Sequence, residues 1–274
     1  MSSNLFGIID GTGARNDGAY DNAMLNSFCS QLKTQLGAHA FYQRGPSGEG
    51  LGLDGKARQA VNFLTRSKTG GRKKLFLAGY SRGCSAALLA AEMLEKKNIG
   101  VEGIILFDPV AKHIGHAVKK LPSNVENSLI FIRHVTPELI KKYEGTIPGE
   151  WSAFGLAPDW VDNPIRPGWG SYFKNLTNSC SIHHDYRTVV GSHGALGGVG
   201  WDHVTEDKKA QNDVANATNA ALTRWGVNAK VKALPNNACF AEASRPTLPS
   251  LEKSQKSQKI FDAHRNFRMS PLSR

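Results

Sequence analysis

The sequence predicts an α/β fold built on a doubly wound, mostly parallel sheet. Three apolar runs, "KLFLAGY", "VEGIILF" and "SLIFIRHV", are short and continuous, as in strands that are covered on both faces. Between the first two lies "RGCSAALLAAEMLEKK", whose composition and length favour a helix. Strand and helix therefore alternate along the chain, which is typical of a parallel sheet with helices on both sides.

The same alternation continues toward both ends of the chain. The remaining predicted elements are strands within 4–9, 38–43 and 180–191 and helices within 20–36, 57–66 and 205–226. In the first of these helices, Leu25 opens a row of apolar residues at helical spacing, Asp21 or Asn22 is the expected N-cap, and Gly37 is the expected stop. We found no internal repeat.

Composition and charge suggest one globular domain with a basic tail. The chain has 274 residues, 40% of them hydrophobic, and a formal net charge of +11. Residues 230–274 carry nine Lys or Arg against three Asp or Glu, so +6 of the +11 lies there. We therefore predict a domain at 1–229 and a flexible tail at 230–274, with an anionic membrane surface as a candidate partner of the tail. The rest of the chain is only mildly basic, so we do not expect a nucleic-acid partner.

Residues 145–179 interrupt the regular pattern. They hold three of the five tryptophans among prolines and glycines and show no clear periodicity. A segment of this length without periodicity is typical of a functional loop, and in a hydrolase it would form a lid or a surface for an acyl chain. The alternative is an irregular excursion whose aromatic side chains complete the core.

The sequence shows no targeting signal and no paired cysteines, and we expect synthesis in the cytoplasm. No stretch approaches the ~20 apolar residues that a membrane-spanning helix needs, and the N-terminus lacks the pattern of a signal peptide. Any export would therefore use a route without a cleavable leader. The cysteines are Cys29, Cys84, Cys180 and Cys239, which are scattered and form no CxxC pair. We expect free thiols, and we expect neither a metal site nor a cofactor.

A glycine-bounded serine stands where a predicted strand gives way to a helix. In "AGYSRGCSA", residues 78–86, Ser81 has Gly79 and Gly83 two positions away on either side. A serine at the apex of such a strained turn needs small neighbours, and the turn lifts its hydroxyl to the positive end of the following helix. We interpret Ser81 as a nucleophile; the alternative is a plain glycine-bounded turn.

A serine nucleophile needs a base, and the base needs a third group that fixes its tautomer. Asp108 directly follows the buried strand "GIILF" and is the favoured acid, with Glu138 as its substitute and a helix-capping role for Asp108 as the alternative. His193 lies between a strand and a glycine-rich loop and is the favoured base, with His203 as the runner-up. The order Ser81, Asp108, His193 is the chain order of the α/β-hydrolase fold.

The negatively charged oxygen of an acyl-transfer intermediate requires backbone donors beside the nucleophile. The N–H of Arg82 is one expected donor of this oxyanion hole. The loop "IIDGTGARND" supplies the second through Gly11 or Thr12, because Gly11 and Gly13 allow a close approach of the backbone. The "DGT" triplet also occurs in phosphate-handling loops, but neither a DxD motif nor a P-loop accompanies it here.

Five motifs together resemble the hydrolase family that was once catalogued as a domain of unknown function and now includes type VI secretion phospholipase effectors. They are "DGTG" at 10–13, "FYQRG" at 41–45, "GYSRGC" at 79–84, "FDPV" at 107–110 and "GSHGALGG" at 191–198. The resemblance implies a triad of Ser81, Asp108 and His193, a phospholipid substrate, leaderless delivery through type VI secretion and an immunity protein as partner.

The chain departs from that family's pattern at four positions. The family often has Asn soon after "DGT", where this chain has Ala14 and Arg15. Pro109 replaces the usual Thr, and Ala195 stands where an acidic residue is common. The loss of that acidic residue removes a hydrogen-bond or ion contact, so lipid preference is the least supported part of the resemblance.

We therefore expect a serine ester hydrolase that cleaves a lipid or other acyl ester through an acyl-enzyme. Two alternatives remain open from the sequence. The first is an acyltransferase or thioesterase that uses the same triad. The second is a non-catalytic interaction module whose basic tail binds an anionic partner.

Overall fold

The described part of the chain forms one six-stranded, all-parallel sheet. The computed structural model describes residues 4–13, 17–45, 52–66, 73–110, 121–134, 183–200 and 205–234. The strands lie in the order β2-β1-β3-β4-β5-β6, and all neighbouring pairs are parallel. Their bounds are β1 Leu5–Ile9, β2 Ala40–Gln43, β3 Leu75–Tyr80, β4 Val101–Phe107, β5 Val125–His134 and β6 His183–Val190. The predicted fold of the α/β-hydrolase type, with its doubly wound parallel sheet, is confirmed.

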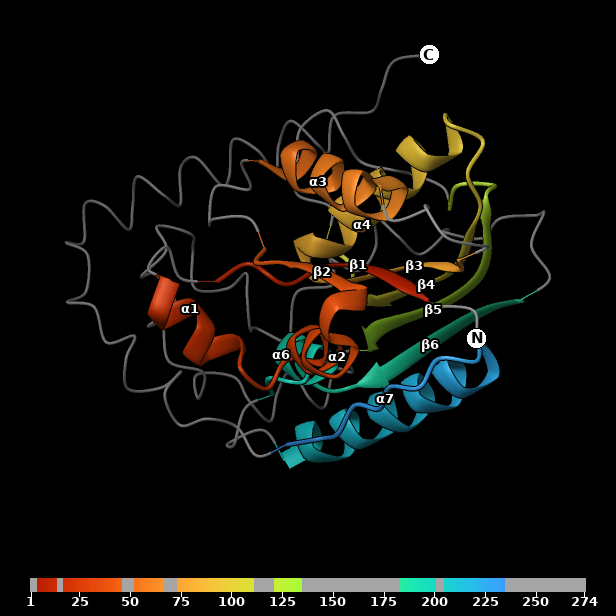
Figure 1. Ribbon diagram of the computed structural model, residues 1–274. Helices are drawn as coiled ribbons and strands as arrows, with labels where there is room; N and C mark the ends of the chain where they lie inside the picture. The colour runs from red at the N-terminus through yellow and green to blue at the C-terminus, as the bar shows by residue number, and fades with distance from the viewer. Residues whose placement is uncertain are drawn as a thin grey trace, which may run out of the picture.

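Helices cover both faces of the sheet (Figure 1). One face packs against α3 (Leu53–Arg66) and α4 (Arg82–Glu95). The opposite face packs against α1 (Asp17–Met24), α2 (Phe28–Leu36), α6 (His193–Gly197) and α7 (Thr205–Arg224). The molecule therefore has three layers, helix, sheet and helix, with a hydrophobic core on each side of the sheet.

The continuous apolar runs of the sequence are explained by burial on both faces. In β3, Leu75 and Leu77 belong to the core under α3 and α4, whereas Phe76 and Ala78 belong to the core under α2 and α7. All six residues of this strand are buried. Because successive side chains point to opposite faces, a strand between two helical layers must be apolar at every position.

The direction of winding reverses between β1 and β3. The chain leaves β1 for β2 on one side and then crosses to β3 on the other side. At such a switch point the loops that follow the two strands diverge, and the carboxyl ends of the strands form the usual place for a ligand. The loop after β1 begins at Asp10 and the turn after β3 is Ser81, so the two predicted site segments meet at this point.

The predicted helix at 20–36 is wrong in one respect, because the structure contains two helices there. α1 ends at Met24 and α2 begins at Phe28, so Asp21 and Asn22 lie inside α1 and Leu25 is exposed. Ser27 is the N-cap of α2: its Oγ accepts a hydrogen bond from the Ser30 amide at 2.9 Å. Gly37 ends α2 with a φ of 53°, as predicted.

The chain after α7 folds back along α2. Val231 is buried, and Gln31 pairs with both backbone groups of Lys232, the Lys232 amide donating to Gln31 Oε1 at 2.8 Å. The rest of the predicted tail from residue 235, and the predicted lid at 145–179, lie outside the described residues. Within the described ranges, no helix has the length and apolar content that a membrane crossing requires.

The contact between β1 and α4 leaves no room for a side chain at Gly83. A Cβ at this position would lie 2.1 Å from the carbonyl oxygen of Ile9 and 2.4 Å from that of Asp10. We predict that Gly83→Ala lowers the free energy of unfolding by about 3 kcal/mol, because the backbone of two elements must separate. Urea denaturation of the purified protein measures this change.

Gly55 in α3 is the matched control, since a Cβ there meets nothing within 4 Å. We expect Gly55→Ala to raise the free energy of unfolding by about 0.5–1 kcal/mol, because alanine restricts the unfolded chain. Equal effects of the two substitutions would contradict the close contact between β1 and α4.

Candidate active site

Ser81 occupies a strained turn between β3 and α4. Its φ of 55° and ψ of −124° are rare for a residue with a side chain. A Cβ at Gly79 would lie 2.7 Å from the backbone of Cys84, so the turn tolerates no side chain at that position. Backbone hydrogen bonds hold the turn: the Ser81 amide donates to the Phe107 carbonyl at 3.0 Å, and the Ser81 carbonyl accepts from the Val110 amide at 3.0 Å.

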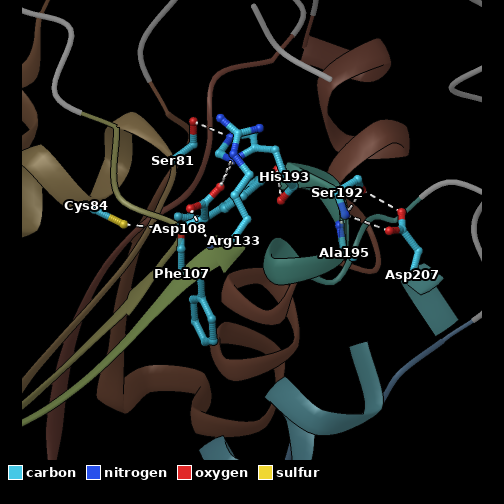
Figure 2. Close-up of polar contacts among 10 residues, drawn as sticks. Ser81, Cys84, Phe107, Asp108, Arg133, Ser192, His193, Ala195 and Asp207 are labelled. Carbon is cyan, nitrogen blue, oxygen red and sulfur yellow. Dashed lines mark hydrogen bonds and ion pairs between the residues drawn. The ribbon is translucent and has the colours of Figure 1, made fainter. Parts of the chain in front are cut away.

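The side chains of Ser81, His193 and Asp108 form a continuous chain of hydrogen bonds (Figure 2). His193 Nε2 lies 2.9 Å from Ser81 Oγ, and His193 Nδ1 lies 2.6 Å from Asp108 Oδ2. An ionised carboxylate can only accept, so Nδ1 carries the proton and the Nε2 lone pair faces the serine hydroxyl. The three predicted residues are therefore brought together in the geometry that general-base activation of a hydroxyl requires.

Charge and burial keep Asp108 ionised and His193 neutral. Burial by itself would raise the pKa of Asp108, but the positive charge of Arg133 and the hydrogen bond from His193 outweigh it and lower the pKa below its ordinary value. Burial lowers the pKa of His193, the contact with Asp108 opposes this, and the charges of Arg133 and Arg82 add to the lowering. The imidazole therefore stays unprotonated, and available as a base, down to a lower pH than an ordinary histidine.

His193 is held from two sides. It is the first residue of α6, whose N-cap Ser192 accepts a hydrogen bond from the Ala195 amide at 3.1 Å. Asp207, from the first turn of α7, accepts hydrogen bonds from the Ser192 amide at 2.7 Å and from the Ser192 hydroxyl at 2.5 Å. On the other side, the ring of Tyr80 stacks on the imidazole with centroids 5.0 Å apart.

A buried network fixes the loop that follows β1. Asp10 accepts hydrogen bonds from the Gly11 amide at 2.8 Å, from Ser27 Oγ at 2.5 Å and from the Tyr42 hydroxyl at 2.9 Å. The Tyr20 hydroxyl donates to the Gly11 carbonyl at 2.7 Å. Burial raises the pKa of Asp10 to about 6, although all three of its hydrogen bonds lower it.

The two candidate oxyanion donors on this loop differ. The backbone N–H of Gly11 already donates a hydrogen bond to Asp10 Oδ1. The Thr12 hydroxyl oxygen is buried and has no hydrogen-bond partner among the described residues. Of the predicted pair, Thr12 is thus the better candidate. Arg82, the other predicted donor, is the first residue of α4, where helix N–H groups lack an intrahelical acceptor.

The remaining candidates have different outcomes. His203 and Glu138, the predicted substitutes, lie outside the described residues. Cys29 and Cys84 are free, as predicted, and both are buried. Cys180 and Cys239 also lie outside the described residues. Within the described ranges, no three His, Cys, Asp or Glu side chains group as metal ligands would.

Sequence reasoning missed two charged residues that touch this site. Arg133 directly follows the apolar run "SLIFI" near the end of β5, as Asp108 directly follows the apolar run "GIILF" of β4, and this parallel in the sequence was the available signal. Asp207 gave no signal, because an acidic residue in the first turn of a helix is an ordinary feature.

Comparisons with known proteins add no family. No protein-family model matches the chain, and no curated protein matches it by sequence. Among solved structures, an uncharacterized protein from Pseudomonas aeruginosa is similar with 13% identity and a TM-score of 0.40 over 97% of this chain and 51% of that one. This chain therefore spans about half the length of that protein.

For two further solved structures, the matched region covers most of this chain and most of the other protein. The NocB thioesterase domain, in covalent complex with a fluorophosphonate nocardicin G analogue, shares 13% identity over 81% of this chain and 95% of that one, with a TM-score of 0.41. An esterase from Pyrobaculum calidifontis shares 15% identity over 98% of this chain and 79% of that one, with a TM-score of 0.31. Likenesses at these TM-scores carry no argument about function; the fold class rests on the sheet order and the turn at Ser81.

Replacing Asp207 tests whether α7 holds the His193 segment. We predict that Asp207→Asn lowers the free energy of unfolding by about 1–3 kcal/mol, because a neutral amide cannot accept both hydrogen bonds from Ser192 without leaving a buried group unpaired. The control is Asp213→Asn on the same helix, whose carboxylate is half exposed and pairs with Lys209. It should change stability by less than about 0.5 kcal/mol. Urea denaturation measures both, and indistinguishable values would rule out the role of Asp207.

The buried carboxyl of Asp10 predicts an unusual dependence of stability on pH. Its pKa of about 6 in the folded protein lies above the ordinary value of 3.8 for an aspartate, so between these pH values the folded state holds a proton that the unfolded chain has released. The protonated Asp10 therefore contributes to the free energy of unfolding, and this contribution is fully present below pH 3.8. As the pH rises through about 6, the free energy of unfolding falls by roughly 3 kcal/mol because Asp10 loses its proton in the folded protein as well.

The measurement compares the wild type with Asp10→Asn, which cannot titrate. The free energy of unfolding of the wild type minus that of the variant should decrease as pH rises from about 4 to about 7. Denaturant titrations across this range would refute the assignment if that difference stays constant.

Proposed function

We propose that the protein is a serine ester hydrolase with Ser81 as nucleophile, His193 as general base and acid, and Asp108 as the residue that orients the base. The observation that carries the proposal is the hydrogen-bonded chain from Ser81 Oγ through the imidazole to Asp108 Oδ2. The strained turn under Ser81 supports the same role, since it is the backbone conformation that a nucleophile elbow requires.

The proposed reaction has two half-reactions. Ser81 Oγ attacks the ester carbonyl carbon while His193 Nε2 takes the hydroxyl proton, and the resulting imidazolium returns that proton to the departing alcohol oxygen. Water then attacks the acyl-enzyme, gives a proton to Nε2 and releases the carboxylic acid as the proton returns to Ser81. No cofactor enters either step.

The neighbouring groups stabilise the charges that develop during this reaction. The carbonyl oxygen becomes negative in each tetrahedral intermediate, and the backbone amides of Arg82 and Thr12 are the proposed donors to it. One such donor is typically worth roughly 3 kcal/mol in the transition state. The imidazolium that forms at the same time lies against the ionised carboxylate of Asp108, and this contact stabilises its positive charge.

The substrate class proposed here is a phospholipid or another lipid ester. Its support is the set of motifs "DGTG", "GYSRGC", "FDPV" and "GSHGALGG", which resembles that of the type VI phospholipase effectors. Delivery through type VI secretion and an immunity protein that blocks the site are proposals with the same support. Docking of the basic segment 230–274 on an anionic membrane is a proposal that rests on the charge of that segment.

Loss of the Ser81 hydroxyl should abolish covalent labelling. We predict that a fluorophosphonate probe labels the wild type and Ser123→Ala, an exposed serine, and leaves Ser81→Ala unlabelled. Hydrolysis of a soluble aryl ester by Ser81→Ala should fall by about 10⁴-fold or more. Labelling that persists in Ser81→Ala would eliminate this residue as the nucleophile.

The same two proteins separate the substrate classes. Vesicles of defined phospholipid should release fatty acid and lysolipid with the wild type and none with Ser81→Ala. Cleavage of soluble esters alone would restrict the proposal to a small-ester hydrolase. Transfer of the acyl group to an added alcohol, in preference to water, would identify an acyltransferase instead.

A further inference from the structure

Arg133 lies at the carboxyl end of β5, directly beside Asp108. The register of the sheet pairs Phe107 with Phe131, and the Asp108 amide donates to the Phe131 carbonyl at 3.0 Å, two residues before Arg133. The arginine is 8% exposed, an unusual burial for a guanidinium group. Figure 2 shows its side chain among those of the three proposed catalytic residues.

Arg133 binds both oxygens of the Asp108 carboxylate. Its backbone N–H donates to Oδ1 at 3.1 Å, and its side-chain Nε lies 3.3 Å from Oδ2. Oδ2 is also the oxygen that accepts the hydrogen bond from His193 Nδ1. With one contact on Oδ1 and two on Oδ2, the carboxylate is held in one orientation, in which Oδ2 faces the imidazole.

The guanidinium of Arg133 has one ion-pair partner within the described part of the chain. Its Nη1 is buried and has no hydrogen-bond partner among the described residues, and Asp108 is the carboxylate in its described ion pair. Asp108 therefore interacts with two groups, the guanidinium and the imidazole, that compete for one negative charge.

The groups around His193 come from five elements. The titratable or charged ones are Asp108 after β4, Arg133 on β5, Arg82 on α4, Tyr80 on β3 and, through Ser192, Asp207 on α7. For Tyr186 on β6, burial raises the pKa of the phenol, and the negative charge of Asp108 adds to this effect. Both positive groups in this set act against protonation of the imidazole.

We propose that Arg133 is a positioning residue of the reaction: it fixes the Asp108 carboxylate toward His193 and places a buried positive charge beside the ring. The inference rests on the proposed function, because it assigns a role within the same triad. It goes beyond that function by naming a fourth side chain that controls the protonation and the position of the base His193.

The sign of the electrostatic effect follows from the two pKa directions. Arg133 lowers the pKa of Asp108 and, by repulsion of the imidazolium, also lowers the pKa of His193. Without the guanidinium the carboxylate stays paired with the imidazole alone, and protonation of the ring becomes easier. The acid limb of kcat/KM, which reports protonation of the base in the free enzyme, then moves to higher pH.

The test substitutes the side chain and keeps the backbone N–H. Arg133→Gln removes the guanidinium, Arg133→Lys retains a positive charge without the Nε contact, and Arg187→Gln removes a partly exposed arginine from the adjacent strand β6 as the matched control. The first readout is the NMR titration of the His193 ring in a Ser81→Ala background, with the resonance assigned by its loss in His193→Asn. This readout requires no activity.

We expect Arg133→Gln to move the His193 titration midpoint and the acid limb of kcat/KM to higher pH, and to lower kcat by about 10- to 100-fold through misplacement of the base. Arg133→Lys should keep the pH profile close to that of the wild type and still lower kcat. Arg187→Gln should match the wild type in both readouts.

An unchanged His193 midpoint in folded Arg133→Gln would overturn the proposal. If Arg133→Gln does not fold, Arg133→Lys decides, and a wild-type kcat in that variant would overturn it. Failure of the proposed function gives a different result, because the wild type would then neither react with a fluorophosphonate nor hydrolyse esters, while the NMR titration would still report the effect of Arg133 on His193.

Discussion

The close approach of β1, β3 and α4 is the constraint on which the rest of the site depends. A Cβ at Gly83 would overlap the backbone carbonyls at the end of β1, and a Cβ at Gly79 would overlap the backbone at Cys84. The turn between them can thus reach its strained conformation only because both neighbours are glycine. The same contact brings the loop after β1 beside Ser81, so one packing event positions both the nucleophile and a proposed oxyanion donor.

The base reaches this turn from a distant part of the chain. His193 lies 112 residues after Ser81, and the segment that carries it is tied to α7 through the bonds from Ser192 to Asp207. α7 packs on the core opposite α4, so the hydrogen bond between imidazole and serine spans the sheet edge between the two helical layers. The site is therefore complete only when both layers are docked, and local loss of α7 would remove the base without disturbing the turn at Ser81.

The fold and the three central residues could be predicted because each leaves a local pattern. Buried parallel strands are apolar throughout, and the Ser81 turn needs glycines at fixed spacing. The break between α1 and α2 could not be predicted, because Ser27 caps α2 while its hydroxyl reaches Asp10, a contact between segments 17 residues apart. Arg133 and Asp207 were missed for a related reason: their role is visible only once neighbouring strands and helices are aligned in space.

Asp10 and Asp108 show how the protein gives different properties to two buried carboxyl groups that both follow strands at the same edge of the sheet. Asp108 follows β4 and meets a guanidinium and an imidazole, so its pKa is lowered and it remains an acceptor for His193. Asp10 follows β1 and its hydrogen-bond donors among the described residues are all neutral, so burial dominates and its pKa rises to about 6. Carboxyl groups whose environments separate their pKa values in this way take different tasks. The group beside charges suits electrostatic support of a base, whereas the group among hydroxyls and an amide suits the structural task of holding the loop that contains Thr12.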